Sequence, residues 1–327
     1  MEYTNLGRTG LRVSKLCLGT MAFGNSCDEK ESFRIMDAAL DAGINFFDTA
    51  DNYGKATNNE GITETILGRW FQQGGGRRER VVLTTKVHEE MHRPYDGPNS
   101  PGGLSAYKVR RHLRESLERL QTDHVELYFM HHIDRTTSWE EMWDVFEQLY
   151  RDGLICYVGT SNHPAWYFTM GQERANQRHF LGITAEQHLY NLLTRQAELE
   201  VLPAARKQGI AVLAYSPLAG GLLTQNGLKK MKKADESNVL DSARRATLRQ
   251  LEQYEAFCRD IGVTQEEAGL AWLIRNPDVT CPIIGVSKAE RIASTVKALE
   301  VKMTPEICRQ LDGIFPPFGE APEAYAW

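Results

Sequence analysis

The sequence predicts one α/β domain, residues 1–327, that folds as a (β/α)8 TIM barrel with an N-terminal β-hairpin and long loops on the C-terminal face. Three observations lead to this fold class. The length of 327 residues is typical of such barrels. Apolar stretches ending in polar residues alternate with amphipathic helical patterns along the chain. No Gly-x-Gly-x-x-Gly fingerprint is present, since GTSN and GGLL do not match it, which disfavours an open dinucleotide-binding sheet.

The expected strands share an apolar run that closes on a polar or small residue. A short hairpin over residues 3–13, with its turn at Arg8-Thr9-Gly10, precedes them and is expected to plug the bottom of the barrel. The strands are placed at Leu16–Gly19, Asn45–Asp48, Val81–Lys86, Val125–His131, Tyr157–Thr160, Thr184–Gln187, Ala211–Tyr215 and Pro282–Gly285.

The expected helices follow the strands one by one, and the third shows the required apolar face with Val109, Leu113, Leu117 and Leu120 at three-to-four spacing. An extra helix over Thr264–Arg275, opened by a Thr-x-x-Glu capping box, is expected between the seventh and eighth units. The eight barrel helices are expected near residues 30–42, 60–73, 106–120, 139–152, 164–178, 196–208, 244–260 and 288–299.

The composition excludes several classes of protein. A net charge of −5 with interspersed acids and bases gives no footprint for nucleic acid or a membrane surface. The start, MEYTNLGRTG, lacks the apolar core of a secretory signal, and the stretch IAVLAYSPLAGGLL is too short to span a bilayer. Six scattered cysteines without Cys-x-x-Cys spacing are expected as reduced thiols of a cytoplasmic protein. No feature fixes the oligomeric state.

The segment DTADNYG, Asp48 to Gly54, places an acid and a phenol at the end of an expected strand. A phenol can deliver a proton near neutral pH if its pKa falls from about 10. Lys86, at the end of another strand, is a candidate for lowering it, and a carboxylate would keep that ammonium charged. Taken singly, the three residues also fit a surface Tyr, an N-cap Asp and a solvated Lys. Together, at strand ends that a barrel brings to one face, they favour chemistry.

The polar strand ends stand within motifs that resemble those of the aldo-keto reductases over nearly the whole chain. These motifs are GINFFDTADNYG, TTK, ELYFMHHID, GTSN, YNLLTR and YSPLAGGLLT, in family order. The resemblance implies NAD(P)H-dependent reduction of a small-molecule carbonyl substrate and a catalytic tetrad of Asp48, Tyr53, Lys86 and His131. The family pattern, in which the His follows LYxx and precedes xxD, selects His131 over His132. Tyr53 would donate the proton, Lys86 held by Asp48 would make the phenol acidic, and His131 would orient the carbonyl.

The resemblance also implies a cofactor cradle, and NADPH rather than NADH, because Ser287, Lys288 and Arg291 open the last helix where a 2′-phosphate would be held. Ser294 and Thr295 depart from many members of the family, which have Glu or Gln followed by Asn at the adenine. The cradle residues are Gly19, Thr20, Met21, Ser161, Asn162, Gln187, Tyr215, Ser216, Leu218, Gly220, Leu222, Gly285, Ser287, Lys288 and Arg291.

Other functions stay open beside a general carbonyl reductase. A metal site at His131-His132 with Asp134 lacks the matching His-x-His of barrel hydrolases, so no metal is expected. The chain also resembles potassium-channel β subunits, which implies a regulatory protein as an alternative, although these commonly have Asn where His131 stands.

A nucleotide-linked keto-sugar is the alternative substrate. The passage GRWFQQGGGRRERVVLTTKV resembles the deoxysugar branch of the family, and a long loop follows Lys86. His88, His92 and Arg93 of that loop would donate to phosphate oxygens. The insertion Thr224–Asp241 and a tail with Phe318, Tyr325 and Trp327 would wall the site.

Overall fold

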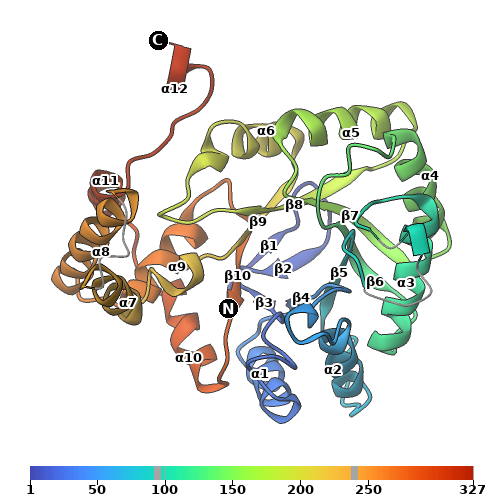
Figure 1. Ribbon diagram of the computed structural model, residues 1–327, viewed down its shortest axis with the longest axis horizontal. Helices are drawn as coiled ribbons and strands as arrows, with labels where there is room; N and C mark the ends of the chain where they lie inside the picture. The colour runs from blue at the N-terminus through green and yellow to red at the C-terminus, as the bar shows by residue number, and fades with distance from the viewer. Residues whose placement is uncertain (92–96, 100, 237–241, 327) are drawn as a thin grey trace.

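Eight parallel strands close into a barrel, as the sequence predicts (Figure 1). The computed structural model describes residues 1–91, 97–99, 101–236 and 242–326. Going round the barrel, the strand order is β10, β3, β4, β5, β6, β7, β8 and β9, and every predicted strand is present with boundaries shifted by at most two residues. The strands are β3 Cys17–Gly19, β4 Phe46–Asp48, β5 Val82–Val87, β6 Val125–Met130, β7 Ile155–Ser161, β8 Ile183–Leu189, β9 Ala211–Tyr215 and β10 Cys281–Gly285.

The predicted hairpin is formed by β1, Tyr3–Asn5, and β2, Arg12–Ser14. Leu6 and Val13 are fully buried and join the apolar cluster inside the barrel. Gly7 is left-handed at φ +52°, and a Cβ there would lie 2.5 Å from the Gly209 carbonyl oxygen, so only glycine fits this close approach. The hairpin therefore closes the N-terminal end of the barrel and leaves the opposite end for the site.

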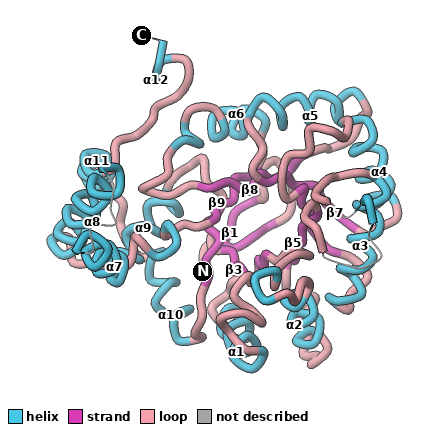
Figure 2. Tube along the Cα trace, viewed as in Figure 1, coloured by secondary structure: helices cyan, strands magenta, loops and turns pink. Residues whose placement is uncertain are grey.

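Helices surround the strands in an outer ring, seen in cyan around the magenta barrel in Figure 2. The third predicted helix is α3, capped by the Ser105 side chain, with Val109, Leu113 and Leu120 buried and Leu117 partly buried against the core. The first six helices of the ring are α1 Glu29–Asp41, α2 Ile62–Phe71, α3 Ala106–Leu120, α4 Trp139–Arg151, α5 Ala165–Gln177 and α6 Val201–Gln208.

The last part of the ring differs from the prediction. The helix expected near 244–260 forms as α8, Ser242–Asp260, but it packs against α7 (Gln225–Glu236), α9 (Gln265–Arg275) and α11 (Pro305–Ile314). The expected extra helix, α9, instead packs against β10, and most of its residues are buried. A helix that is apolar on most sides is stable between two layers, here β10 and α8. The capping box of Thr264 and Glu267 is present as predicted.

Two predicted helices are broken. Residues 196–208 divide into a 3-10 turn, Gln196–Glu198, and α6, because Pro203 fits the first turn of a helix but not its interior. Residues 288–299 divide into α10, Glu290–Val296, and a 3-10 turn, Lys297–Leu299.

Within the part of the chain that the structure describes, three α-helices were not expected from the sequence: α7 Gln225–Glu236, α11 Pro305–Ile314 and α12 Glu323–Ala326. With α8, the helices α7 and α11 form a group outside the ring (Figure 1).

The C-terminal tail does not wall the barrel mouth as predicted. The Ala321 N–H donates to the Leu199 carbonyl, and Glu320 pairs with Arg206 on α6. Phe318 is 46% and Tyr325 71% exposed, and α12 projects away from the barrel (Figure 1). The tail is thus fastened to the outside of the barrel; Trp327 lies outside the described residues.

Candidate active site

Lys86 lies at the centre of the site, fully buried near the C-terminal end of β5. Its ammonium donates to Asp48 Oδ2 at 2.7 Å, to the Thr49 carbonyl at 2.8 Å and to the Tyr53 hydroxyl at 3.0 Å. Parallel pairing of β4 with β5, which sets Asp48 opposite Thr84, brings the carboxylate to the ammonium. Burial lowers the pKa of Lys86, but the Asp48 carboxylate and Tyr53 outweigh burial and hold that pKa above its ordinary value. The lysine is therefore charged.

Asp48 is held by more partners than the sequence indicated. Its Oδ1 accepts from the Thr84 hydroxyl at 2.7 Å and from the Gln187 amide at 2.9 Å, while Oδ2 faces Lys86. The TTK motif contains Thr84, yet its contact with Asp48 depends on strand register. A buried carboxylate with three donors is fixed in position and remains a stable partner for the ammonium.

Tyr53 reaches the lysine because the loop after β4 folds back tightly. Gly54 has φ +108°, and a Cβ there would stand 2.0 Å from the Asn59 carbonyl oxygen, so this turn requires glycine. Burial raises the pKa of the Tyr53 phenol, and the Lys86 charge opposes that rise without cancelling it. The phenol consequently holds its proton at neutral pH, as a proton donor must, whereas the sequence led us to expect a lowered pKa.

His131 follows β6 directly, with its ring centroid 6.0 Å from that of Tyr53 in an edge-on arrangement. Burial, followed by the Lys86 charge, holds the pKa of His131 well below its ordinary value, so the imidazole is neutral. Among the described residues, its buried Nδ1 has no hydrogen-bond partner. A buried polar atom of this kind beside a phenol is available to a ligand.

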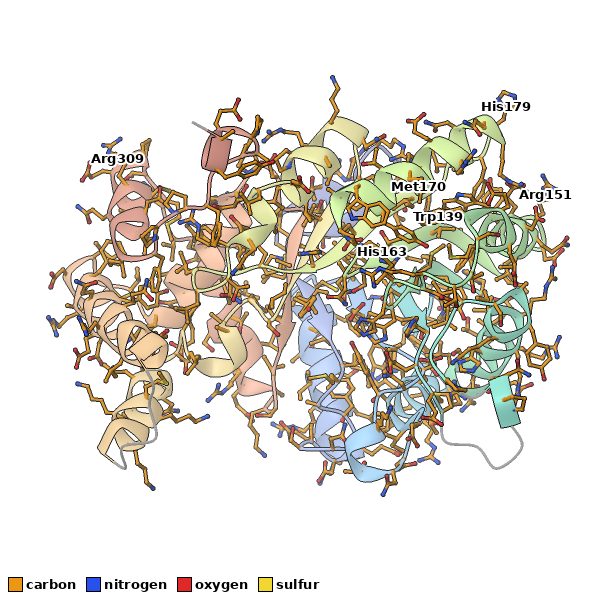
Figure 3. The ribbon with its side chains drawn as sticks, turned by 45° about the horizontal axis from the view of Figure 1, so that its top comes forward. Trp139, Arg151, His163, Met170, His179 and Arg309 are labelled. Carbon is orange, nitrogen blue, oxygen red and sulfur yellow. The ribbon has the colours of Figure 1, made fainter. Side chains whose placement is uncertain are left out.

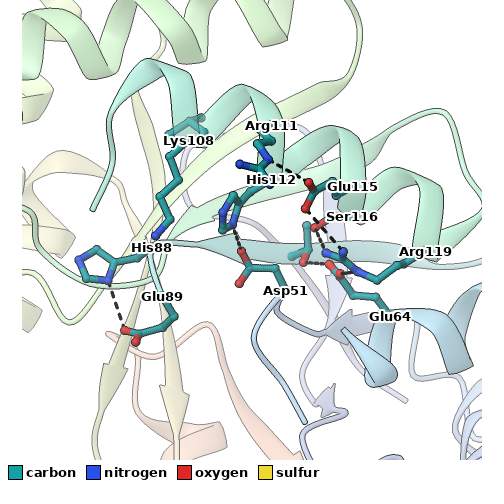
Figure 4. Close-up of polar contacts among 12 residues, drawn as sticks. Asp51, Glu64, His88, Glu89, Lys108, Arg111, His112, Glu115, Ser116 and Arg119 are labelled. Atoms are coloured by element: carbon teal, nitrogen blue, oxygen red, sulfur yellow. Dashed lines mark hydrogen bonds and ion pairs between the residues drawn. The ribbon is translucent and has the colours of Figure 1, made fainter. Parts of the chain in front are cut away.

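A buried polar network that the sequence did not reveal supports the loop and β5 from behind (Figure 4). Asp51 Oδ2 lies 2.6 Å from His112 Nδ1 on α3, and both side chains are buried. Glu64 of α2 accepts from Thr85 at 2.5 Å and from Arg119 at 2.7 Å. The first contact ties the loop of Tyr53 to α3, and the contacts of Glu64 tie α2 to β5 and α3.

Several predicted cofactor residues gather beside the tetrad. The Ser161 hydroxyl donates to the Gln187 carbonyl at 2.9 Å, and the Tyr215 hydroxyl donates to Asn162 Oδ1 at 2.8 Å. The Asn162 amide also donates to the His131 carbonyl at 3.2 Å, and Asn162 is left-handed at φ +60°. Thr20, between Gly19 and the 65%-exposed Met21, donates to the Asp48 carbonyl at 2.9 Å.

His163, the residue after Asn162, belongs to an aromatic cluster with Trp139 (Figure 3). His163 is fully buried, donates from Nδ1 to the Ser161 carbonyl at 2.8 Å, and lies with its ring 6.3 Å from Trp139 and 5.5 Å from Tyr167. Burial lowers the pKa of His163, so the ring is neutral and holds the turn by a hydrogen bond.

The remaining cradle residues lie at the ends of β9 and β10. The turn after Tyr215 is left-handed at Ser216, Ala219, Gly220 and Gly221 and includes Leu218 and Leu222. A Cβ built at Gly220, Gly221 or Gly285 would meet no atom within 4 Å, so a ligand can approach this backbone closely. Ser287, Lys288 and Arg291 are exposed around the start of α10.

One feature of α10 was not foreseen. The Ala289 N–H at its start donates to Glu31 Oε1 at 2.8 Å, so a carboxylate of α1 already occupies this donor. A phosphate near α10 would therefore depend on the Lys288 and Arg291 side chains more than on the helix end. The open backbone, the clustered amides and the free imidazole atom together fit a dinucleotide.

The described residues contain no group of three or more His, Cys, Asp or Glu side chains placed to hold a metal ion. Among the helices of the described ranges, none combines the length and apolar character needed to cross a bilayer. His88 lies beside Glu89, and His92 and Arg93, which the sequence assigned to phosphate binding, lie outside the described residues.

Residues 15–315 match the model of the aldo/keto reductase family. The chain belongs to the aldo/keto reductase family. It is therefore an oxidoreductase of a family that generally uses NAD(P)H.

The chain is 54% identical over 328 residues to the uncharacterized oxidoreductase YrpG of Bacillus subtilis (strain 168), and the alignment covers 100% of both proteins. It is 35% identical over 337 residues to a probable voltage-gated potassium channel subunit beta of Oryza sativa subsp. japonica, covering 99% of this chain and 100% of that protein. A probable subunit of the same name in Arabidopsis thaliana is 31% identical over 337 residues, with 99% and 100% covered.

Proposed function

We propose that this aldo/keto reductase reduces an aldehyde or ketone to an alcohol with NADPH, and that Tyr53 is the general acid. The observation that carries the proposal is the buried chain of contacts from Asp48 to Lys86 at 2.7 Å and on to Tyr53 at 3.0 Å. This series of hydrogen bonds places a proton donor and a positive charge together at the mouth of the barrel.

The residues divide the chemistry among them. When bound, the nicotinamide cofactor supplies the hydride. Tyr53 hydrogen-bonds the carbonyl oxygen and gives it a proton as negative charge develops there. Lys86 stabilises the phenolate that Tyr53 becomes, and Asp48 keeps Lys86 charged. Neutral His131 lies beside Tyr53, where a ring N–H can orient the carbonyl oxygen.

The cradle residues support a position for the cofactor. Asn162, Ser161 and Gln187 would hold the carboxamide, and Tyr215 would stack on the nicotinamide ring. The backbone at Gly220 and Gly285 would lie along the dinucleotide, with Gly19, Thr20 and Met21 at its inner end. Lys288 and Arg291 would favour a 2′-phosphate through charge-assisted hydrogen bonds, which supports NADPH over NADH.

A regulatory role is the second candidate, because two relatives are named as probable potassium channel β subunits. His131 beside Tyr53 favours turnover instead. Purified protein with NADPH deuterated at the reacting carbon separates the two. The reductase predicts deuterium in the alcohol product of a carbonyl screen, and a purely regulatory protein predicts tight NADPH binding without transfer.

A further inference from the structure

A row of rings leads outward from the tetrad. The Tyr53 and His131 centroids are 6.0 Å apart, His131 stacks on His132 at 4.9 Å, and His132 meets His88 edge-on at 5.4 Å. The row runs from the phenol to the loop after β5. A carbonyl compound at Tyr53 with atoms that reach along this row would contact these imidazoles.

The row ends on a carboxylate, Glu89 (Figure 4). Its Oε1 lies 3.2 Å from His88 Nδ1 and 3.4 Å from His132 Nε2. The hydrogen bond from His88, opposed by burial, holds the pKa of Glu89 below its ordinary value, and the charge of Lys55 on the Tyr53 loop acts in the same direction. The side chains of Glu89 and His132 remain 26% and 43% exposed. The site mouth thus presents an ionised, accessible acceptor.

His132 also lies close to Asn162, with 3.4 Å between its Nδ1 and the Asn162 amide nitrogen. The two hydrogens of that amide have closer acceptors, the Ser161 hydroxyl at 3.0 Å and the His131 carbonyl at 3.2 Å. Burial lowers the pKa of His132 despite the opposing charge of Glu89, so the ring is neutral. Both histidine contacts involve Oε1 of Glu89, and the partly exposed carboxylate can accept a further hydrogen bond.

We propose that Glu89, His88 and His132 form a subsite for substrate hydroxyl groups, so that the substrate is a hydroxylated aldehyde or ketone of the sugar type. The proposal rests on the reductase function proposed above. A hydroxyl can donate to the carboxylate and accept from an imidazole. An alkyl chain would instead remove these polar groups from water without compensation. A carboxylate or phosphate at the same place would be repelled by Glu89.

The test compares glyceraldehyde with propanal, which share a three-carbon chain and differ in hydroxyl groups. The Glu89→Gln substitution keeps the shape of the side chain and removes its charge. It lowers kcat/KM for glyceraldehyde about tenfold to a hundredfold, as expected for a lost hydrogen bond to a charged group, while propanal changes by less than about twofold. His132→Phe keeps a ring against His131 and lowers the ratio of kcat/KM for glyceraldehyde to kcat/KM for propanal. For anionic glyoxylate, the Glu89→Gln substitution raises kcat/KM because it removes the repelling charge.

The matched control is Glu79→Gln, which makes the same change of charge at an exposed residue before β5 and leaves both substrates unaffected. An unchanged glyceraldehyde-to-propanal ratio in Glu89→Gln, in a protein with wild-type melting temperature, overturns the subsite and leaves the reductase standing. A wild-type enzyme that turns over glyceraldehyde and propanal equally also overturns the subsite and leaves the reductase function standing. No hydride transfer to any carbonyl overturns the proposed function and the subsite with it.

Discussion

A Lys86→Met variant removes the ammonium that lies 3.0 Å from the Tyr53 hydroxyl while keeping an unbranched side chain. An adjacent opposite charge shifts a pKa by about one to three units, and each unit corresponds to about 1.4 kcal/mol. The pKa of Tyr53, already raised by burial, would rise further. Because proton transfer would then lose about 1.4 to 4 kcal/mol of stabilisation, kcat should fall about tenfold to a thousandfold.

The same variant leaves the Asp48 carboxylate buried with only its contacts to Thr84 and Gln187 among those described above. Breaking a buried ion pair costs about 3 to 5 kcal/mol, so the melting temperature should also fall. Steady-state NADPH oxidation with saturating carbonyl measures kcat, and fluorescence titration with NADPH confirms that the variant is folded. A folded Lys86→Met protein with wild-type kcat would refute the assignment of Lys86 to proton transfer.

Three further predictions follow from the geometry. Arg291→Ala should reduce the kcat/KM preference for NADPH over NADH about tenfold or more. The control Lys297→Ala removes an exposed cation farther along the chain and should leave this preference unchanged. Equal preferences in Arg291→Ala and the wild type would contradict a role of Arg291 in phosphate binding. Because burial lowers the folded-state pKa of His163, the unfolded chain binds a proton at this residue before the folded protein does as the pH falls. The free energy of unfolding should therefore fall below about pH 6.5, by up to about 1.4 kcal/mol per pH unit. Urea denaturation of His163→Asn should show a shallower fall with pH, and an identical slope would count against burial as the cause. Gly54→Ala places a methyl 2.0 Å from the Asn59 carbonyl at a left-handed position, so the free energy of unfolding should drop by about 2 kcal/mol or more and turnover should be lost; wild-type values of both would show that the loop can rearrange.

The barrel could be predicted because each strand is a continuous apolar run that ends in a polar residue, and this pattern needs only local sequence. The proximity of Asp48, Tyr53, Lys86 and His131 could be predicted because three of these residues end such runs or follow them immediately, and parallel strands bring those ends to one face. Residues contributed from distant helices could not be found in this way. Ala289 and Glu31 are 258 positions apart in the sequence, and Asp51 and His112 are 61 positions apart. No local spacing of residues therefore predicts either contact.

The roles of α8 and α9 were exchanged for a related reason. Residues 244–260 have the longer amphipathic pattern, while α9 is short and apolar on most sides, and only the packing partners distinguish a ring helix from an added one. The direction of the Tyr53 pKa was also missed. The charge of Lys86 is visible in the sequence, but the burial that outweighs it depends on the folded loop.

The most direct test of the account is the Tyr53→Phe variant measured in a single turnover with bound NADPH and a carbonyl substrate. Phenylalanine keeps the ring beside His131 and removes the hydroxyl that receives the Lys86 hydrogen bond. Loss of a positioned general acid should slow hydride transfer about a hundredfold to ten-thousandfold, with NADPH affinity nearly unchanged because other strand ends hold the cofactor. Transfer at close to the wild-type rate would contradict the assignment of Tyr53 as the proton donor.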